Sequence, residues 1–336
     1  MSVLIIGGCG FIGTNTFFYL RKKKYRITIV DKLKNKSSNI NKAIIKKKYP
    51  TTSIYKIDIK DFKKISKIIN NLKPKIILLL SGQVAVTKSL NNPREDFHDN
   101  LLGVFNVLES IKKYSPKSAL VSLSSNKVYG DLNWLKLSKK KLSYKSKKSI
   151  NETFPLDPTS PYACSKLSAD HYVIDYFKNF NVKALVLRLS CVYGPFQWSS
   201  EDQGWVTWIL KKILLKEKIN IFGNGKQVRD ALFVNDLCAL IEMCFKKIEI
   251  TKGHIFNIGG GRSNSLSLLE LINFFKKKNS YDKSNIKYFN SRPGDQKFYI
   301  SDLSKINKFV GWKPTTNVKI GILKVSNWLK TVNKNI

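Results

Sequence analysis

The chain has 336 residues, of which 43% are hydrophobic, so it is long enough to bury one large core or two smaller ones. Its 60 lysines and arginines against 23 acidic residues give a formal net charge of +37. Only seven of the basic residues are arginines, and the lysines are spread along nearly every predicted helix. Nucleic-acid-binding surfaces concentrate their charge and use arginine, so this diffuse excess of lysine disfavours a nucleic-acid-binding function.

The cysteines and the N-terminus bear on the cellular compartment. The five cysteines form no CxxC motif and are interpreted as small core residues of a protein in a reducing compartment. The first apolar run leads directly into glycines, without the basic and hydrophobic regions of a signal peptide. No stretch approaches the roughly 18 consecutive apolar residues of a transmembrane helix. We therefore expect a cytoplasmic protein with no membrane contact and no metal site.

Short apolar runs alternate with helical patterns through the first half of the chain. The predicted strands are 3–6, 27–30, 54–57, 76–80 and 119–123, and the clearest helical stretch is 93–114. Strands of four to six residues that alternate with helices are typical of a parallel, doubly wound sheet.

The first predicted strand ends in a glycine-rich turn, GGCGFIG, which opens a helical pattern reaching to about residue 23. Gly7, Gly10 and Gly13 allow the backbone to turn tightly and to approach a pyrophosphate, which then lies at the positive N-terminus of the helix. The turn therefore predicts a dinucleotide-binding site.

Acidic residues follow the second and third predicted strands. Asp31 is placed to accept hydrogen bonds from the adenosine ribose hydroxyls, and its charge would repel a 2′-phosphate, which favours NAD over NADP. Lys32 and Lys34 lie nearby and weaken that preference slightly. Asp58 either holds the adenine or caps the helix that follows it.

The second half of the chain is less regular. A lysine-rich stretch at 131–160 is predicted to be a long exposed loop. It is followed by a helix at 161–180, a strand at 184–189 and short helices near 204–216, 234–247, 267–278 and 318–330. We expect an NAD-binding Rossmann domain at 1–189 and a smaller α/β substrate-binding lobe at 190–336, interleaved with the first domain around 230–260.

Tyr162 and Lys166 are spaced i and i+4, which places both side chains on one face of the predicted helix. A lysine ammonium beside a phenol stabilises the phenolate, so we expect a lowered pKa for Tyr162 and a proton acceptor for alcohol chemistry. Ser124 and Ser125 follow the fifth strand, where ligands bind in doubly wound sheets. Ser125 would then hydrogen-bond the substrate oxygen that Tyr162 deprotonates.

These motifs, together with Arg188 and the Tyr-Gly-Pro that follows it at 193–195, resemble the extended short-chain dehydrogenase/reductase family of nucleotide-sugar enzymes. The resemblance covers nearly the whole chain. It implies a Rossmann-type fold and a catalytic triad of Ser125, Tyr162 and Lys166. The cofactor contacts that it implies are Gly7, Gly10, Phe11, Ile12, Gly13, Asp31, Asp58, Ile59, Ser81, Gln83, Asn100, Ser124, Tyr162 and Lys166.

Within that family the chain is most similar to the CDP-tyvelose (CDP-paratose) 2-epimerases, in stretches at 126–131, 202–206, 223–230, 256–260, 264–270 and 292–296. Ser125 replaces the threonine expected in that group, and Cys191 stands where many relatives carry asparagine. The 4,6-dehydratases of the family carry an Asp-Glu pair where this chain has Asn126 and Lys127. Neither side chain can act as a carboxylic general acid, so dehydration is disfavoured.

Arg229 and Arg292 are two of only seven arginines, and a planar, multi-donor guanidinium suits a diphosphate. The alternative for both is a structural pair with Asp230 or Asp295. The other expected substrate contacts are Ser125, Asn126, Gln203, Trp205 and Gln227. Trp205 fits a position in the core equally well.

The predicted function is an NAD-dependent epimerase acting at C2 of a CDP-hexose or CDP-dideoxyhexose, by transient oxidation and hydride return. By resemblance we also expect a homodimer or homotetramer formed through the helices at 93–114 and 161–180, and a role in lipopolysaccharide O-antigen biosynthesis. One alternative is a UDP-glucose 4-epimerase-type activity. A more distant one is a non-catalytic dinucleotide-fold protein that binds RNA.

Overall fold

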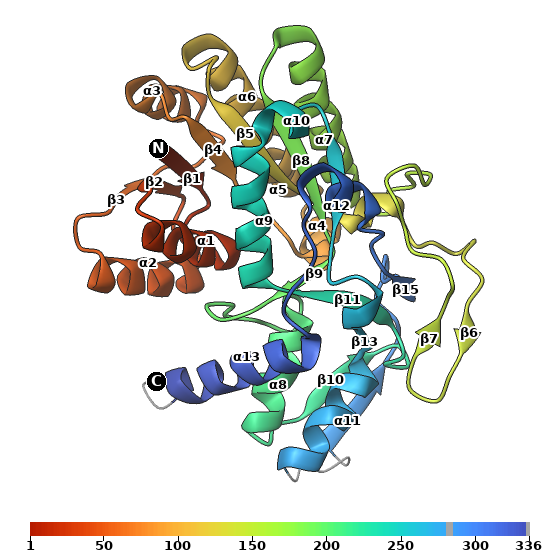
Figure 1. The fold of residues 1–336 in the computed structure, drawn as a ribbon. Helices are drawn as coiled ribbons and strands as arrows, with labels where there is room; N and C mark the ends of the chain where they lie inside the picture. Colours follow the sequence, from red (N-terminus) through yellow and green to blue (C-terminus); the bar gives the residue numbers. More distant parts are fainter. Residues whose placement is uncertain (280–284, 334–336) are drawn as a thin grey trace.

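The fold is built on a seven-stranded parallel sheet with helices on both faces (Figure 1), in a computed structural model that describes residues 1–279 and 285–333. The strand order is β3-β2-β1-β4-β5-β8-β12. The strands are β1 (Ser2–Ile6), β2 (Arg26–Asp31), β3 (Ser53–Lys56), β4 (Ile76–Leu79), β5 (Ala119–Ser125), β8 (Ala184–Leu189) and β12 (Ile255–Ile258). The order reverses between β1 and β4, which is where doubly wound sheets bind their ligands.

The predicted doubly wound sheet is confirmed, and two details differ from the expectation. β5 continues to Ser125, so both predicted serines lie within the strand and not after it. β12 is not among the predicted strands, because four residues between glycine-rich turns carry little strand signal of their own. It pairs in parallel with β8 and lies within 230–260, where the second lobe is expected to be interleaved with the first domain.

Two buried clusters of apolar side chains hold helices against the two faces of the sheet. One face is covered by α1 (Phe11–Lys22), α2 (Lys36–Lys48), α9 (Val234–Lys246) and α12 (Ser304–Val310). The other face is covered by α3 (Phe62–Leu72), α6 (Gly103–Tyr114) and α7 (Pro161–Phe180). In α3 the apolar positions Ile65, Ile68 and Ile69 recur at i, i+3 and i+4, so a single stripe of the helix is buried.

Helix α7 has the bounds that the sequence predicts. The Ser160 hydroxyl accepts a hydrogen bond from Ala163 N at 3.2 Å, and Pro161 takes the first helical position. The helix ends before Asn181, which adopts a left-handed conformation with a φ of 54°. These caps fix the start of the helix and so place Tyr162 and Lys166 in its first two turns.

The predicted helix at 93–114 contains an irregular centre. It consists of α5 (Pro93–Phe97), a π-helical turn (His98–Leu102) and α6. The π-turn carries Asp99 and Asn100, which are both buried. π-turns inside helices often lie at functional sites, and this one faces the candidate site described below.

The second half of the chain forms a smaller lobe beneath the sheet (Figure 1), with the predicted helices α8 (Trp205–Leu214), α11 (Leu268–Asn279) and α13 (Val318–Asn333). Its strands are β9 (Cys191–Tyr193), β10 (Ile219–Phe222), β11 (Val228–Phe233), β13 (Ser265–Ser267), β14 (Ile286–Phe289) and β15 (Phe298–Tyr299). β11 joins β9, β13 and β15 in one sheet, and β10 pairs with β14. The short helices elsewhere are α4 (Val86–Asn91), α10 (Ile248–Thr251) and 3-10 turns at Asn126–Tyr129 and Arg262–Asn264.

The segment at 131–160 is only partly the exposed loop that was expected. It forms a short hairpin of β6 (Ser138–Lys139) and β7 (Tyr144–Lys145), at the right of Figure 1. Leu132, Leu135 and Ile150 are buried in a cluster with Tyr299. The expectation of full exposure was wrong for these three residues, because isolated apolar positions among lysines give no periodic signal.

Within 1–279 and 285–333, no helix is long and apolar enough to cross a membrane.

Glu242 on α9, whose side chain is buried, joins α9 to the C-terminal end of α1 and the residues that follow it. Its carboxylate forms ion pairs with Lys23 and with Lys246, the latter at 2.9 Å. The hydroxyls of Tyr19 and Tyr25 donate to it at 3.1 and 3.0 Å. Burial opposes ionisation, but the hydrogen bonds from the two lysines outweigh it and lower the pKa of Glu242 to about 2.

We expect Glu242→Gln to lower the free energy of unfolding by about 2–3 kcal/mol at neutral pH. A carboxylate with a lowered folded-state pKa stabilises the fold above its unfolded pKa and loses that contribution as the pH falls. The difference between wild type and variant should therefore shrink from about pH 5 towards about pH 2. Urea denaturation at several pH values measures it.

Glu249→Gln is the matched control, because Glu249 also pairs with two lysines but its side chain is 60% exposed. Exposed pairs contribute little, so this variant should unfold at nearly the same urea concentration as wild type. Equal losses for both variants would contradict a special role for the buried cluster.

Candidate active site

A cavity of about 490 Å³ lies at the carboxyl ends of β1, β2 and β4, at the point where the strand order reverses. Ten of the predicted cofactor residues line it: Gly7, Gly10, Phe11, Ile12, Gly13, Asp31, Asp58, Ile59, Ser81 and Gln83. Gln203, predicted as a substrate contact, lines it as well. The structure thus brings together residues from five separate stretches of sequence.

Two glycines of the turn, Gly7 and Gly13, are packed so closely that side chains do not fit. A Cβ atom at Gly13 would lie 2.2 Å from the carbonyl oxygen of Gly7 and 2.6 Å from Cα of Gly8. Gly7 has a φ of 83°, and a Cβ atom there would lie 2.6 Å from the backbone nitrogen of Ser81. The turn therefore presents bare backbone and the N-terminus of α1 to the cavity, which suits a pyrophosphate.

Asp31 is held by the backbone at the rim of the cavity. Its carboxylate accepts hydrogen bonds from Cys9 N at 3.0 Å and from Leu33 N at 2.9 Å. Burial raises the pKa of Asp31, and these two backbone donors act in the opposite direction. The side chain is thus fixed in place, as a ribose-binding carboxylate requires.

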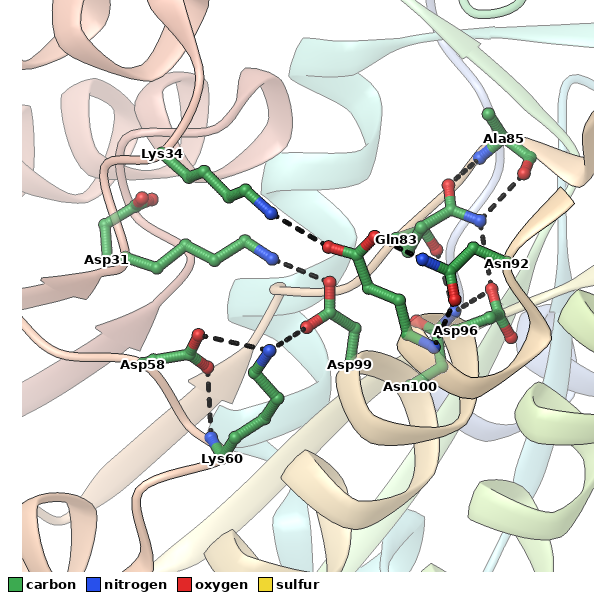
Figure 2. Close-up of polar contacts among 12 residues, drawn as sticks. Asp31, Lys34, Asp58, Lys60, Gln83, Ala85, Asn92, Asp96, Asp99 and Asn100 are labelled. Atoms are coloured by element: carbon green, nitrogen blue, oxygen red, sulfur yellow. Dashed lines mark hydrogen bonds and ion pairs between the residues drawn. The ribbon is translucent and has the colours of Figure 1, made fainter. Parts of the chain in front are cut away.

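The two lysines beside Asp31 are paired with carboxylates across the cavity. Lys32 Nζ lies 2.6 Å from Asp99, and Lys34 Nζ lies 2.9 Å from Glu95. Figure 2 shows Lys34 extended from the Asp31 strand end towards the helix that carries Asp99. Both ammonium groups therefore have a carboxylate partner on the far side of the cavity.

Asp58 is not a helix cap. Asp61 caps α3 instead, accepting a hydrogen bond from Lys64 N at 3.1 Å. Asp58 accepts from Lys60 N at 3.1 Å, and Lys60 Nζ lies between Asp58 and Asp99, at 3.6 and 3.5 Å (Figure 2). Of the two interpretations left open, the cap is wrong, and the position in the cavity fits an adenine contact.

Two of the predicted cofactor residues carry buried polar atoms that lack a partner within the described part of the chain. The Asn100 amide nitrogen donates to Gln83 O at 3.0 Å and to Asp96 at 2.9 Å (Figure 2), whereas its Oδ1 has no donor. The Ser81 hydroxyl also lacks a partner. Leaving such atoms unpaired is costly, so they fit the polar groups of a bound dinucleotide.

The predicted reacting residues meet beside this cavity. Ser125, Tyr162 and Lys166 are all buried, and the Ser125 hydroxyl acts on the Tyr162 phenol as a hydrogen-bond partner. Lys166 Nζ donates to Leu123 O at 3.4 Å. A Cβ atom at Gly82, which lines the cavity, would lie 3.1 Å from Lys166 Nζ. Lys166 therefore adjoins the end of the cavity that holds Gly82, whereas Ser125 and Tyr162 are not among the residues that line it.

The expected lowering of the Tyr162 pKa is wrong for the protein without ligands. Burial raises the pKa of Tyr162 to about 12, and although the Ser125 hydroxyl lowers it, the carboxylates of Asp96 and Asp170 raise it further. Burial also lowers the pKa of Lys166. Sequence analysis missed both acids. Asp170 could have been found four residues after Lys166, whereas Asp96 lies on a distant helix and gives no local signal.

Asp170 belongs to a buried network behind the reacting residues. It accepts a hydrogen bond from Arg188 Nε at 2.9 Å, and Arg188 donates to the Tyr129 hydroxyl at 3.0 Å. That hydroxyl donates to Asn257 Oδ1 on β12 at 2.9 Å. The network ties α7 to β8 and to the loop after β5, and so fixes the helix face that carries Tyr162.

Two of the predicted substrate residues, Arg229 and Gln227, share one carboxylate. Arg229 lies 2.7 Å from Asp295 Oδ1, and the Gln227 amide donates to Asp295 Oδ2 at 3.2 Å. The Arg-Asp pair that the sequence left open as an alternative is therefore present for Arg229, and the partner is Asp295. Asp230 instead accepts from Ser190, Ser301 N and Gly261 N.

Arg292 lies against the loop that precedes α8. Its guanidinium donates to Glu201 O at 3.1 Å, lies 3.3 Å from Asp202 and is stacked 3.8 Å from the ring centroid of Phe222. Trp205 packs against the core of the small lobe, which is the structural alternative considered for it. Within the described residues, no group of three or more histidine, cysteine and acidic side chains could hold a metal ion.

The loop after β5 is fastened to the segment that carries Arg292. The Asn126 amide donates to Gln296 Oε1 at 3.1 Å. Lys127 Nζ donates to Gly294 O at 2.9 Å. These two contacts hold Asn126 and Lys127 against the segment 294–296.

Comparison with known proteins assigns the family. The family model described as GDP-mannose 4,6 dehydratase matches residues 4–325. The chain belongs to the GDP-mannose 4,6 dehydratase family. This membership confirms the resemblance to the extended short-chain dehydrogenase/reductase family of nucleotide-sugar enzymes.

Two curated members of the family match the chain along nearly its whole length. CDP-paratose 2-epimerase of Salmonella typhi is 35% identical, covering 99% of this chain and 100% of the relative. A putative UDP-glucose 4-epimerase of Methanocaldococcus jannaschii is 30% identical and covers 99% of each chain.

Solved structures of the family share the fold. UDP-glucose 4-epimerase of Thermotoga maritima, solved with UDP-glucose, aligns with a TM-score of 0.84 at 27% identity over 99% of this chain and 100% of its own. dTDP-glucose 4,6-dehydratase of Bacillus anthracis, solved in complex with NAD, aligns with a TM-score of 0.83 at 26% identity over 99% and 98%. The predicted Rossmann-type class is confirmed.

Proposed function

We propose that this protein is an NAD-dependent nucleotide-sugar epimerase that acts at C2 of a CDP-sugar. The observation that carries the proposal is the buried Ser125–Tyr162 pair, together with Lys166, whose Nζ lies close to Gly82 of the cavity lined by the glycine turn and Asp31. Asn126 and Lys127 stand beside them, so the reacting centre has no carboxylic acid in the loop to eliminate water. The similarity to CDP-paratose 2-epimerase supports the choice of sugar nucleotide and carbon.

In this proposal Asp31, Ser81 and Asn100 hold NAD, which supplies a reversible hydride acceptor when bound. Ser125 orients the substrate hydroxyl, and the Tyr162 phenolate accepts its proton as the carbon is oxidised. The Lys166 ammonium stabilises the phenolate. The keto-sugar then rotates in the site, and Tyr162 returns the proton to the oxygen as the opposite face of the ketone is reduced.

The pKa of Tyr162 is raised in the protein alone, so a nearby positive charge is needed for Tyr162 to act as a base. Oxidised nicotinamide is positively charged, and a positive charge near a phenol lowers its pKa. The carboxylates of Asp170 and Asp96 favour the protonated form of Lys166, whereas burial opposes it. Phenolate formation is thus coupled to occupancy of the cofactor site.

Proton NMR in deuterated water tests the proposal. CDP-paratose, CDP-tyvelose, CDP-glucose and UDP-glucose are each offered to the purified protein without added NAD. Conversion of a CDP-sugar to its C2 epimer with no deuterium in the product is expected, because the same hydride returns. Deuterium at C6 would indicate dehydratase chemistry and would contradict the argument from Asn126 and Lys127.

The second candidate is a UDP-glucose 4-epimerase-type activity, supported by the relative from Methanocaldococcus jannaschii. It uses the same three reacting residues, so the NMR panel separates the two by the nucleotide and the carbon that change. If the protein converts none of the nucleotide sugars and binds RNA in a salt-sensitive manner, a non-catalytic RNA-binding function is favoured instead.

We also propose a homodimer that uses the outer faces of α5, α6 and α7. Phe97 on α5 and Tyr172 and Phe180 on α7 are 49%, 42% and 46% exposed, and exposed apolar patches mark contacts between proteins. A homotetramer would extend the same contact. Sedimentation equilibrium that shows only a monomer at micromolar concentration would contradict this.

The cellular setting is proposed from the same observations. All five cysteines are free, which fits a reducing cytoplasm, and the similarity to CDP-paratose 2-epimerase suggests a role in O-antigen biosynthesis. Fractionation that recovers the protein outside the cytoplasm would contradict the location.

A further inference from the structure

We propose that Lys127 is a specificity-determining residue that binds the β-phosphoryl group of the nucleotide sugar and so fixes C2 as the reacting carbon. The inference rests on the proposed function, because it concerns how the same substrate is held. It assigns a role to a partly buried lysine that the proposed chemistry does not otherwise use.

Lys127 is anchored directly beside the reacting serine. It is the second residue of the 3-10 turn that follows β5, and its backbone nitrogen donates to the Ser125 hydroxyl at 3.2 Å. Its side chain extends to the other lobe, where Nζ donates to Gly294 O at 2.9 Å. A group bound at this ammonium therefore lies within one side chain's reach of the oxygen that Ser125 holds.

The ammonium has more donors than the protein satisfies. An ammonium carries three N–H donors, and the Gly294 carbonyl is one acceptor. No carboxylate of the described residues lies within 4.0 Å of Lys127 Nζ, the limit for an ion pair. Lys127 is partly buried, and an anionic oxygen is the ligand that best accepts from the free N–H donors of a partly buried cation.

The charged groups around Lys127 support a phosphoryl ligand. Burial lowers the pKa of Lys127 to about 8, and the Arg229 guanidinium lowers it further, whereas Asp295 and Asp131 act in the opposite direction. Arg229 pairs with Asp295, and Arg292 lies two residues before Gly294. Lys127 and Arg229 thus contact the neighbouring residues Gly294 and Asp295, whereas the Arg292 guanidinium contacts Glu201 and Asp202. A diphosphate carries enough negative charge to complement the two cations at 294–295.

The position of the phosphate in the sugar connects Lys127 to the reacting carbon. In a nucleotide sugar the β-phosphoryl group is attached through oxygen to C1, and C2 is the neighbouring ring carbon. C4 lies across the ring from C1. A cation anchored beside Ser125 can bind the β-phosphoryl group while Ser125 holds the oxygen of C2, whereas placing C4 at Ser125 would carry the phosphate away from it. The geometry therefore favours C2 chemistry.

Calorimetric titration of the NAD-loaded protein with CDP and with CMP tests the role, because the two ligands differ by the β-phosphoryl group. We expect Lys127→Met to weaken CDP binding by roughly ten- to hundredfold and to leave CMP binding within about twofold. Lys127→Arg keeps a cation and should restore most of the loss. Lys67→Met, an exposed lysine on α3, is the control and should change neither ligand.

The pH dependence separates binding from a structural role. Because the pKa of Lys127 lies at about 8, its ammonium is lost in the free protein above that pH. The ratio of CDP affinity to CMP affinity should therefore fall above about pH 8 in wild type and stay flat in Lys127→Arg, since arginine keeps its charge. A lysine that only supports the fold would not produce this difference.

Each other outcome is decisive. An unchanged CDP affinity in Lys127→Met would overturn the proposal, and so would equal losses for CDP and CMP, which would mark Lys127 as structural. If wild type binds neither CDP nor CMP, UDP and UMP are used in the same way. If no nucleoside diphosphate binds wild type, the proposed function itself fails, and the role of Lys127 fails with it.

Discussion

Turnover of the substrate is expected to fall by about a thousandfold when Tyr162 is replaced by phenylalanine, while bound NAD is retained. The phenol is buried beside Ser125, and it is the proton acceptor of the proposed reaction. Phenylalanine keeps the ring and its packing, so the free energy of unfolding should change by less than about 1 kcal/mol. Single-turnover rates and the absorbance of bound nicotinamide measure the two effects separately.

The matched control is Tyr176→Phe. Tyr176 lies on the same helix and is also buried, but its hydroxyl donates to Glu109, away from the cavity. Turnover of this variant should stay within about threefold of wild type. A Tyr162→Phe protein with unchanged turnover would remove Tyr162 from the mechanism.

The pH dependence of kcat/KM provides a second test of the role of Tyr162. Burial raises its pKa in the protein alone, so the phenolate fraction increases as the pH rises towards that value. We expect kcat/KM of wild type to increase from about pH 7 to about pH 9, and the residual rate of Tyr162→Phe to lack that increase. The same slope in both proteins would assign the titration to another group.

Gly13→Ala is expected to weaken NAD binding by about a hundredfold or more and to destabilise the fold by roughly 2–4 kcal/mol. The added Cβ atom would lie 2.2 Å from Gly7 O and 2.6 Å from Gly8 Cα. Both neighbours are backbone atoms of the turn, so no side chain can move aside. The turn would have to open, and with it the surface that faces the pyrophosphate.

Gly10→Ala provides a graded comparison within the same turn. A Cβ atom at Gly10 meets only Gly7 O, at 3.2 Å, so the ligand-free protein should lose less than about 1 kcal/mol. Thermal unfolding without NAD and titration with NAD measure stability and binding in turn. Equal destabilisation by the two variants would show that the packing at Gly13 is not special.

Local patterns predicted most of the sheet, because strands of buried apolar residues, glycine turns and caps are encoded over a few adjacent residues. The capped helix α7, from Ser160 to Asn181, is the clearest case. β12 and the buried leucines at 132 and 135 were harder to predict, because their partners are distant in the sequence and their own patterns are short. The π-turn at 98–102 has no local sequence signature that we used.

The candidate site divides in the same way. The glycine turn, Asp31 and the Tyr162 to Lys166 spacing could be predicted, since each is a short motif at a strand end or helix start. The direction of the Tyr162 pKa could not, because it depends on burial and on Asp96, which only the fold brings near. Pairings such as Arg229 with Asp295 also depend on how the lobes meet.

The path of the chain through the sheet has a consequence for biosynthesis. β12 and helices α9 and α12 complete the edge and one face of the sheet that begins at β1, although they lie more than 200 residues further along the chain. In a nascent chain that has reached only β8, the apolar side chains of α1 and of the sheet face that it covers would remain exposed to water on the side where α9 and α12 later pack. The glycine turn therefore emerges from the ribosome early but gains its final support late, so a newly made molecule is expected to capture NAD only near the end of synthesis.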